Sequence, residues 1–151
     1  MTEARIRRLP EELVASALFL LKRLGAVAKE EASDAYDELG LHPYHHAVLA
    51  LLDEGERETQ GEIADALGYD RGQLVGLLDE LEDGGLAERQ RDPNDRRRQL
   101  VRITPAGRKT LGEARALSAR LEDDFLGSLD EDERTELHRL LLRVAEEKLP
   151  S

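Results

Sequence analysis

Three consecutive arginines, Arg96 to Arg98, carry the strongest chemical signal in this chain of 151 residues. The window of residues 84–109 holds eight basic and three acidic residues, a net charge of +5, whereas the remaining residues carry −16 and bring the total to −11. Guanidinium groups bind phosphate oxygens, and one basic surface on an acidic protein is typical of contact with a nucleic-acid backbone. The alternative is that the charge run is only a solvated loop. The predicted elements around it must distinguish the two interpretations.

Three histidines, His42, His45 and His46, form a second cluster. His45 and His46 follow His42 by three and four residues, so on a helix either pair shares a face, as metal-binding histidines do. His138 stands alone and is expected at a surface or an interface. We predict no cofactor and no metal site, although whether the cluster binds a metal stays open at this point.

Other residue patterns argue against an enzyme. The sequence shows no glycine-rich phosphate loop, no nucleophile motif and no His–Glu metal signature. The acidic runs 122–124 and 130–133 are typical of solvated helix ends. The chain has no cysteine, which excludes disulfides and thiol-based redox sensing. We therefore predict that the protein is not an enzyme.

Composition predicts one globular, mainly helical unit. Apolar residues make up 40% of the chain and charged residues 36%, while aromatic residues make up 3%, so the core must consist of Leu, Val, Ile and Ala. No segment approaches the length of a membrane helix, and the first residues lack the apolar stretch of a signal peptide. We expect a soluble, cytoplasmic protein.

Apolar residues spaced three and four apart predict long helices at both ends of the chain. One helix is expected over residues 10–39 and the next over 42–55. Thr104-Pro105 suits an N-cap followed by the first helical position, so a helix is expected over 105–126. A last helix over 130–150 opens with a capping box.

Two shorter helices are predicted between these ends. The segments Thr59–Glu62 and Asp70–Gln73 each have the residues of a capping box, an N-cap oxygen followed by Glu or Gln three residues later. The first helix ends at Gly68 and the second at Gly84. A short helix, a turn and a longer helix form the helix-turn-helix arrangement.

The arginine run falls in a predicted β-hairpin. Its strands occupy residues 86–91 and 98–103, the second with alternating side chains, and Asp92-Pro93 favours a type I turn at the tip. A hairpin directly after a helix-turn-helix is a winged helix. The predicted fold class is mainly α (α+β): a winged helix-turn-helix DNA-binding domain flanked by long N- and C-terminal dimerisation helices, whose apolar stripes one copy alone would leave exposed.

These segments resemble the MarR family of transcriptional regulators. The stretch Asp92-Pro-Asn-Asp-Arg-Arg-Arg-Gln-Leu-Val-Arg-Ile-Thr-Pro-Ala-Gly107 is similar to the family's wing signature, and the resemblance covers about residues 10–148. The implied domains are an N-terminal dimerisation helix in 1–39, a winged helix-turn-helix in 40–104 with its recognition helix at about 70–84 and its wing at about 86–104, and C-terminal dimerisation helices in 105–151.

The resemblance also implies which residues contact DNA. The family's Asp-x-Arg motif falls on Asp95 and Arg97; the arginine enters the minor groove and the aspartate holds it in place. Many members have Thr-Arg in the recognition helix where this chain has Val75-Gly76. Base contacts are therefore expected from the first turn of that helix. The predicted DNA-binding residues are Arg71, Gln73, Asp95, Arg96, Arg97 and Arg98.

A small anionic or aromatic effector is a further implication of the resemblance, bound in the crevice between the dimerisation and DNA-binding parts. The resemblance favours structural roles for the histidines, because His42 takes the place of an N-cap threonine and His46 that of a packing aromatic residue. By helical position, the pocket residues are predicted to be Phe19, Lys22, Arg23, Tyr44 and His46.

The predicted function is therefore that of a homodimeric repressor, which binds a pseudo-palindromic operator in double-stranded DNA and is released by the effector. The alternative is a winged-helix module for protein–protein interaction without specific DNA binding, which the net charge of −11 would suit. The arginine cluster at the wing tip favours DNA, because a protein-binding wing does not require it.

Overall fold

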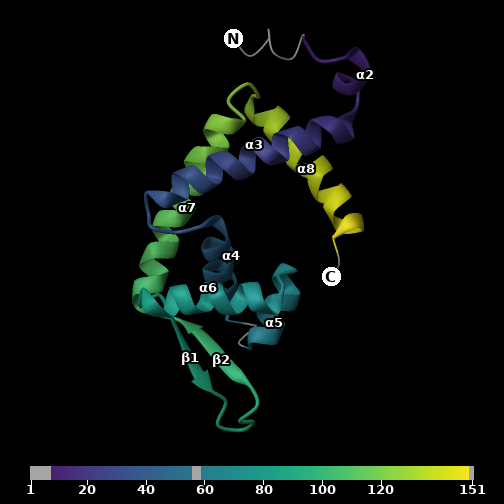
Figure 1. Cartoon of the computed structure of the whole chain (residues 1–151). Coiled ribbons are helices and arrows are strands. Elements are labelled where there is room, and N and C mark those ends of the chain that lie inside the picture. Colours follow the sequence, from purple (N-terminus) through teal and green to yellow (C-terminus); the bar gives the residue numbers. More distant parts are fainter. Residues whose placement is uncertain (1–7, 56–58, 150–151) are drawn as a thin grey trace.

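The structure, a computed structural model, describes residues 8–55 and 59–149. Figure 1 shows an elongated molecule with α3 and α8 at one end, the helix-turn-helix with the β1–β2 hairpin at the other, and α7 running between them. This order confirms the predicted mainly-α winged-helix fold with long flanking helices. The elements are α2 Glu11–Val14, α3 Ala17–Asp37, α4 Pro43–Glu54, α5 Gln60–Leu67, α6 Arg71–Asp83, β1 Ala87–Arg91, β2 Gln99–Ile103, α7 Pro105–Phe125 and α8 Glu131–Lys148.

The first helix, predicted as one piece over residues 10–39, is divided in two. Ser16 lies between α2 and α3 with an extended backbone (φ −88°, ψ 115°), and its Oγ accepts a hydrogen bond from the Phe19 N–H at 3.2 Å. A serine N-cap therefore starts a new helix inside a continuous apolar pattern. The prediction of a single helix was wrong because apolar spacing continues across the break.

Side-chain caps begin the helices of the winged helix. The side chains of Thr59 and Asp70 each accept the backbone N–H three residues later, so α5 and α6 begin where the sequence predicts. Neither helix forms the reciprocal bond of a full capping box among the described residues. Full boxes occur at Asp130–Glu133, as predicted, and at His42–His45, where the sequence analysis had not predicted one.

Two apolar clusters hold the chain together. The larger cluster fills the winged helix with buried side chains from α4, α5, α6, both strands and Leu111 of α7. The smaller cluster joins α3 to α7 through Tyr36, Leu41, Ala114 and Leu117. A fully buried Leu contributes about 1.5–3 kcal/mol relative to an exposed one. Because α7 belongs to both clusters, it connects the winged helix to the terminal helices.

The base of the hairpin is fixed to the start of α7. The Thr104 hydroxyl donates to the Gly85 carbonyl oxygen at 2.6 Å and accepts from the Gly107 N–H at 2.9 Å. A side chain at position 107 would collide with the Leu86 carbonyl oxygen and lie 2.8 Å from Cγ1 of Ile103. The Thr-x-x-Gly end of the wing motif therefore sets where the antiparallel β1–β2 hairpin leaves the body of the protein.

No helix in residues 8–55 or 59–149 is long and apolar enough to span a membrane.

Candidate nucleic-acid interface

Helix α6, the predicted recognition helix, has one buried and one exposed face. Its buried residues are Leu74, Leu77, Leu78 and Leu81. At 3.6 residues per turn, the opposite side forms a strip that we call the outer strip, consisting of Gly72, Val75, Gly76 and Asp79. The predicted base-contacting residues Arg71 and Gln73 are both exposed and lie on the two sides of this strip.

Sequence reasoning did not assign a role to Val75. The position of Val75 could have indicated a role, because this valine falls outside the three-and-four spacing of the buried α6 leucines. The structure leaves the Val75 side chain 39% exposed.

Hydrogen bonds within the turn at the wing tip fix its backbone. The Asp92 N–H donates to the Arg98 carbonyl oxygen at 2.9 Å, and the Arg98 N–H donates to the Asp95 carbonyl oxygen at 3.0 Å. The Asp92 Oδ1 accepts the Asn94 N–H at 2.9 Å, and the Asp95 Oδ1 accepts the Arg97 N–H at 3.1 Å. Two local aspartate turns therefore give the arginine-bearing tip a defined shape.

The expected clamp between Asp95 and the Arg97 guanidinium is not present. The Asp95 carboxylate instead binds the backbone N–H of Arg97, two residues away, which is the hydrogen bond that aspartate side chains readily form in turns. Among the described residues, neither Arg96 nor Arg97 has an ion-pair partner for its guanidinium. Asp95 thus positions the backbone that carries Arg97, and the side chains of Arg96 and Arg97 are both exposed.

Several other basic residues are paired within the chain. The Arg98 Nη2 lies 3.1 Å from Glu62 Oε1 on α5, although Arg98 was predicted as a DNA-binding residue. The Arg108 Nε lies 3.4 Å from Asp53 Oδ1 at the end of α4. These partners lie far away in the sequence, so the charge count of the basic window overstates the positive charge that a ligand would meet.

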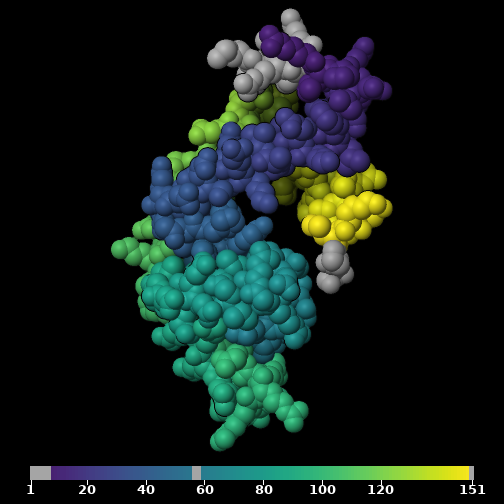
Figure 2. Space-filling model, in the orientation of Figure 1, coloured from purple at the N-terminus to yellow at the C-terminus, as the bar shows by residue number. Residues whose placement is uncertain are grey.

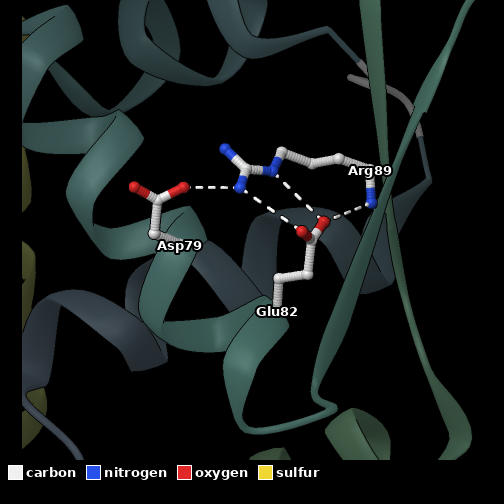
Figure 3. A network of polar contacts seen from close by, with 3 residues as sticks. All are labelled: Asp79, Glu82 and Arg89. Atoms are coloured by element: carbon white, nitrogen blue, oxygen red, sulfur yellow. Dashed lines mark hydrogen bonds and ion pairs between the residues drawn. The ribbon is translucent and has the colours of Figure 1, made fainter.

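Arg89 on β1 joins the wing to α6 (Figure 3). Its Nε and its backbone N–H both donate to Glu82 Oε2, at 3.2 and 3.0 Å, and its Nη2 donates to Asp79 Oδ1. Hydrogen bonding from Arg89 lowers the pKa of Glu82, and the hydrogen bonds to Glu82 and Asp79 raise the pKa of Arg89. Arg89 therefore compensates two negative charges on the exposed side of α6.

A hollow of about 270 Å³ lies between α5, α6 and the wing. It brings together arginines from two elements that are separate in sequence, Arg71 at the start of α6 and Arg97 and Arg98 at the wing tip. This concentration of guanidinium groups suits an anionic ligand such as a phosphate. Its lining is Thr59, Gln60, Gly61, Arg71, Leu74, Val75, Arg97, Arg98 and Gln99.

The histidine cluster is engaged in contacts between helices. His42 Nδ1 accepts the Tyr44 N–H at 3.2 Å, and His45 Nδ1 accepts the His42 N–H at 2.9 Å. The Nε2 of His45 therefore carries its proton and donates to Glu80 Oε2 on α6 at 2.6 Å. Within residues 8–55 and 59–149, no group of three or more His, Asp or Glu residues is arranged to hold a metal ion.

His46 links α4 to α3 through the buried Tyr36. The Tyr36 hydroxyl lies 2.5 Å from His46 Nδ1. Burial lowers the pKa of His46, and the positive charge of Arg115 lowers it further. Burial raises the pKa of Tyr36, and a hydrogen bond with Ser118 offsets part of that rise. Both shifts favour a neutral imidazole that accepts the tyrosine proton in a hydrogen bond.

A largely apolar pocket of about 360 Å³ lies between α3, α7 and α8, with Pro43 at its edge. None of the five residues predicted for an effector pocket lines it. Tyr44 packs against Tyr69 at a ring-centroid distance of 5.1 Å, His46 bonds Tyr36, and Phe19, Lys22 and Arg23 lie in the N-terminal part of α3. Their assignment to an effector site stays a prediction. Its lining is Ala28, Glu31, Ala32, Tyr36, Pro43, Ser118, Leu121, Glu122, Phe125, Leu126, Leu137 and Leu141.

Known proteins are similar to this chain in sequence and in fold. A profile of the MarR family matches residues 39–98. The uncharacterized HTH-type transcriptional regulator YcgE of Bacillus subtilis (strain 168) is 34% identical over 98 residues, which are 65% of this chain and 64% of that protein. The transcriptional regulator HosA of Escherichia coli O111:H- is 32% identical over 98 residues, 65% of this chain and 72% of HosA. In three curated relatives, YcgE included, the chain spans 62–64% of the relative's length, less than two thirds.

Solved structures match over most of the chain. The transcriptional repressor CouR bound to a 23-mer DNA duplex superposes with a TM-score of 0.82 at 36% identity, covering 91% of this chain and 99% of CouR. CouR from Rhodococcus jostii RHA1 bound to p-coumaroyl-CoA superposes with a TM-score of 0.77 at 29% identity, covering 94% and 98%. One structure therefore holds DNA and the other a small molecule, on the fold described above.

Proposed function

The chain belongs to the MarR family of transcriptional regulators, and we propose that it is a homodimeric repressor that leaves its operator when a small molecule binds. Its relatives are transcriptional regulators, so the prediction that it is not an enzyme is confirmed. The observation that carries the proposal is the combination of α6 with a wing tip on which the side chains of Arg96 and Arg97 are exposed and, among the described residues, have no ion-pair partner. Acting on DNA, the protein would work in the cytoplasm.

For DNA binding we propose that α6 enters the major groove and the wing the adjacent minor groove. Arg97 would enter the minor groove, where a narrow A·T-rich segment has enhanced negative potential. Arg71 and Gln73 would contact base edges from the sides of the outer strip, as guanidinium and amide groups do. Arg96 would contact a phosphate. Arg98 would also contact a phosphate, after its ion pair with Glu62 has broken. Asp95 would act through the turn backbone.

For the dimer we propose that residues 1–39 and 105–151 supply the interface. The support is a set of exposed apolar side chains on the terminal helices, far more than a monomer normally leaves in water. The set contains Leu18, Leu20, Leu21, Leu24 and Val27 on α3 and Leu140, Leu141, Leu142 and Val144 on α8. Two-fold symmetry would present two copies of α6 to a pseudo-palindromic operator with half-sites about one helical turn apart.

For the effector we propose the pocket between α3, α7 and α8 in place of the five residues predicted from sequence. Its apolar walls suit an aromatic or aliphatic body, and Tyr36 with Ser118 supplies polar groups at one wall. Tyr36 also forms a hydrogen bond with His46, and the preceding residue, His45, forms one with Glu80 on α6. A ligand that moves Tyr36 would therefore act on the helix that holds α6.

The experiment is a selection of binding sites from random duplex DNA, followed by fluorescence anisotropy on the selected site over a range of salt. We expect an enriched pseudo-palindrome and an affinity that falls steeply with salt, because each neutralised phosphate contributes about −0.9 to the logarithmic slope. Uniform binding to all sequences, or none at low salt, would contradict the proposal and leave the protein–protein module as the better reading.

A further inference from the structure

We infer that Val75 determines part of the DNA specificity by contacting the C5 methyl group of a thymine in the major groove. The inference rests on the proposed DNA-binding function and adds a base-contacting residue to it. It also gives a role to the position at which this chain departs from the Thr-Arg pair expected there.

The exposure of Val75 is unusual within its part of the molecule. Large apolar side chains that are exposed occur in the N-terminal segment with α3, and in the C-terminal segment with α8. Between residues 28 and 139 of the described chain, Val75 is the one large apolar side chain left exposed. The dimer proposed above therefore does not account for it.

Packing inside the chain does not explain a valine at this position either. The four leucines of α6 already complete its buried face, and β-branched residues are mediocre helix formers. The neighbouring Gly76 has no side chain to shield it, and a Cβ built there would meet nothing within 4 Å. The Val75 side chain thus stays 39% exposed beside a stretch of helix that has no side chain at Gly76.

The surroundings of Val75 identify the partner as DNA. Val75 lines the same hollow as Arg71, Arg97 and Arg98, so its apolar surface is set among guanidinium groups. A protein partner would require a much larger apolar patch than one valine. The edges of base pairs in the major groove offer one apolar group, the thymine methyl. An isolated apolar side chain on the recognition helix, beside Arg71, Arg97 and Arg98 in the same hollow, therefore fits thymine.

The test uses the full chain and the operator obtained by selection. Each thymine of the operator is replaced in turn by deoxyuridine, which lacks the C5 methyl group and keeps every hydrogen-bonding group. Affinities are measured by anisotropy for the wild type, Val75→Ala and Val75→Thr, with circular dichroism and light scattering to confirm an intact protein.

At one thymine per half-site we expect the wild type to lose about fourfold in affinity on removal of the methyl group, the equivalent of about 0.8 kcal/mol. Val75→Ala should bind the thymine site about as weakly as the wild type binds the deoxyuridine site, and should be insensitive to the exchange. Val75→Thr, which keeps one methyl group, should retain part of the sensitivity.

The inference would be overturned if Val75→Ala and the wild type lost the same affinity on deoxyuridine exchange at every thymine. It would also be overturned if the wild type lost no affinity at any of them. In both cases an enriched operator would leave the proposed function intact. A selection that returns no preferred sequence would overturn the inference and the proposed function together.

Discussion

At the wing tip, Arg97 combines an exposed side chain with a fixed backbone. The Arg97 side chain faces solvent, while its N–H is held by Asp95 and the turn is closed by hydrogen bonds between Asp92, Asp95 and Arg98. The tip is therefore preorganised even though the Arg97 side chain is not. Affinity gained from such a residue depends on its charge and on the turn that presents it.

Arg97→Ala should weaken binding to all sequences and reduce the salt slope by about one charge, because one phosphate-directed or groove-directed cation is lost. Asp95→Ala should weaken binding less and leave the slope nearly unchanged, since the charge of Arg97 remains. Asp95→Asn should behave like the wild type, because its amide oxygen still accepts the Arg97 N–H. Anisotropy titrations at several salt concentrations measure all three. An Asp95→Asn variant as weak as Asp95→Ala would indicate instead a carboxylate–guanidinium contact formed on DNA.

Two glycines of α7 provide a matched pair for the role of the wing motif. Gly107→Ala should destabilise the protein by about 2–3 kcal/mol, because the new methyl group collides with the Leu86 carbonyl oxygen and neither backbone can move freely. Gly112→Ala on the same helix meets nothing within 4 Å and should stabilise it by about 0.5–1 kcal/mol through helix propensity. Urea unfolding at one protein concentration measures both. Equal effects would show that position 107 has no special steric demand.

Among the elements, those with local signals were predictable from sequence. Thr59, Asp70, Thr104 and Asp130 mark helix starts through their own side chains, and Asp92-Pro93 marks the wing turn, so the winged helix follows from short stretches of chain. The break at Ser16 was missed because serine is common inside helices and the apolar pattern continues through it.

Contacts between elements were not predictable in the same way. Arg98 with Glu62, and Tyr36 with His46, join residues whose proximity depends on how helices and wing are packed. The pocket between α3, α7 and α8 depends on how three helices pack, so positions counted along α3 and α4 could not predict its lining. Sequence patterns indicated that the wing is basic, and the structure was needed to distinguish paired from unpaired arginines.

The contact between β1 and α6 makes a prediction of its own. Arg89→Gln should weaken DNA binding about three- to tenfold, because Asp79 and Glu82 then face the phosphate backbone without their positive partner. Adding Asp79→Asn should restore part of the affinity. Arg91→Gln, which removes a neighbouring cation of the same strand, should not be rescued by Asp79→Asn. Anisotropy on the selected operator tests the four variants. If Asp79→Asn does not restore affinity to Arg89→Gln, and Arg89→Gln reduces the salt slope by one charge, Arg89 would be a direct phosphate contact.

On the scale of the whole molecule, one copy leaves two apolar surfaces without a partner. Figure 2 shows α3 and α8 at one end of the molecule and the wing projecting from the other, with open space between α8 and the winged helix. The terminal helices are attached to the winged helix mainly through α7. A second copy that covers α3 and α8 would therefore fix the separation of two recognition helices, and a ligand between these helices would alter it.

Val144→Glu tests this arrangement. The Val144 side chain is 53% exposed on α8, and a carboxylate there would have to be buried without a partner in the proposed dimer, so dimerisation should fail. Light scattering should give about twice 16.9 kDa for the wild type and about 16.9 kDa for the variant at micromolar concentration. Val75→Glu is the matched control, the same replacement on an exposed face of α6, and should keep the dimer mass while abolishing specific DNA binding. Dimeric Val144→Glu would exclude this face of α8 from the interface. A wild type of 16.9 kDa would remove the dimer, and with it the reason to expect a palindromic operator.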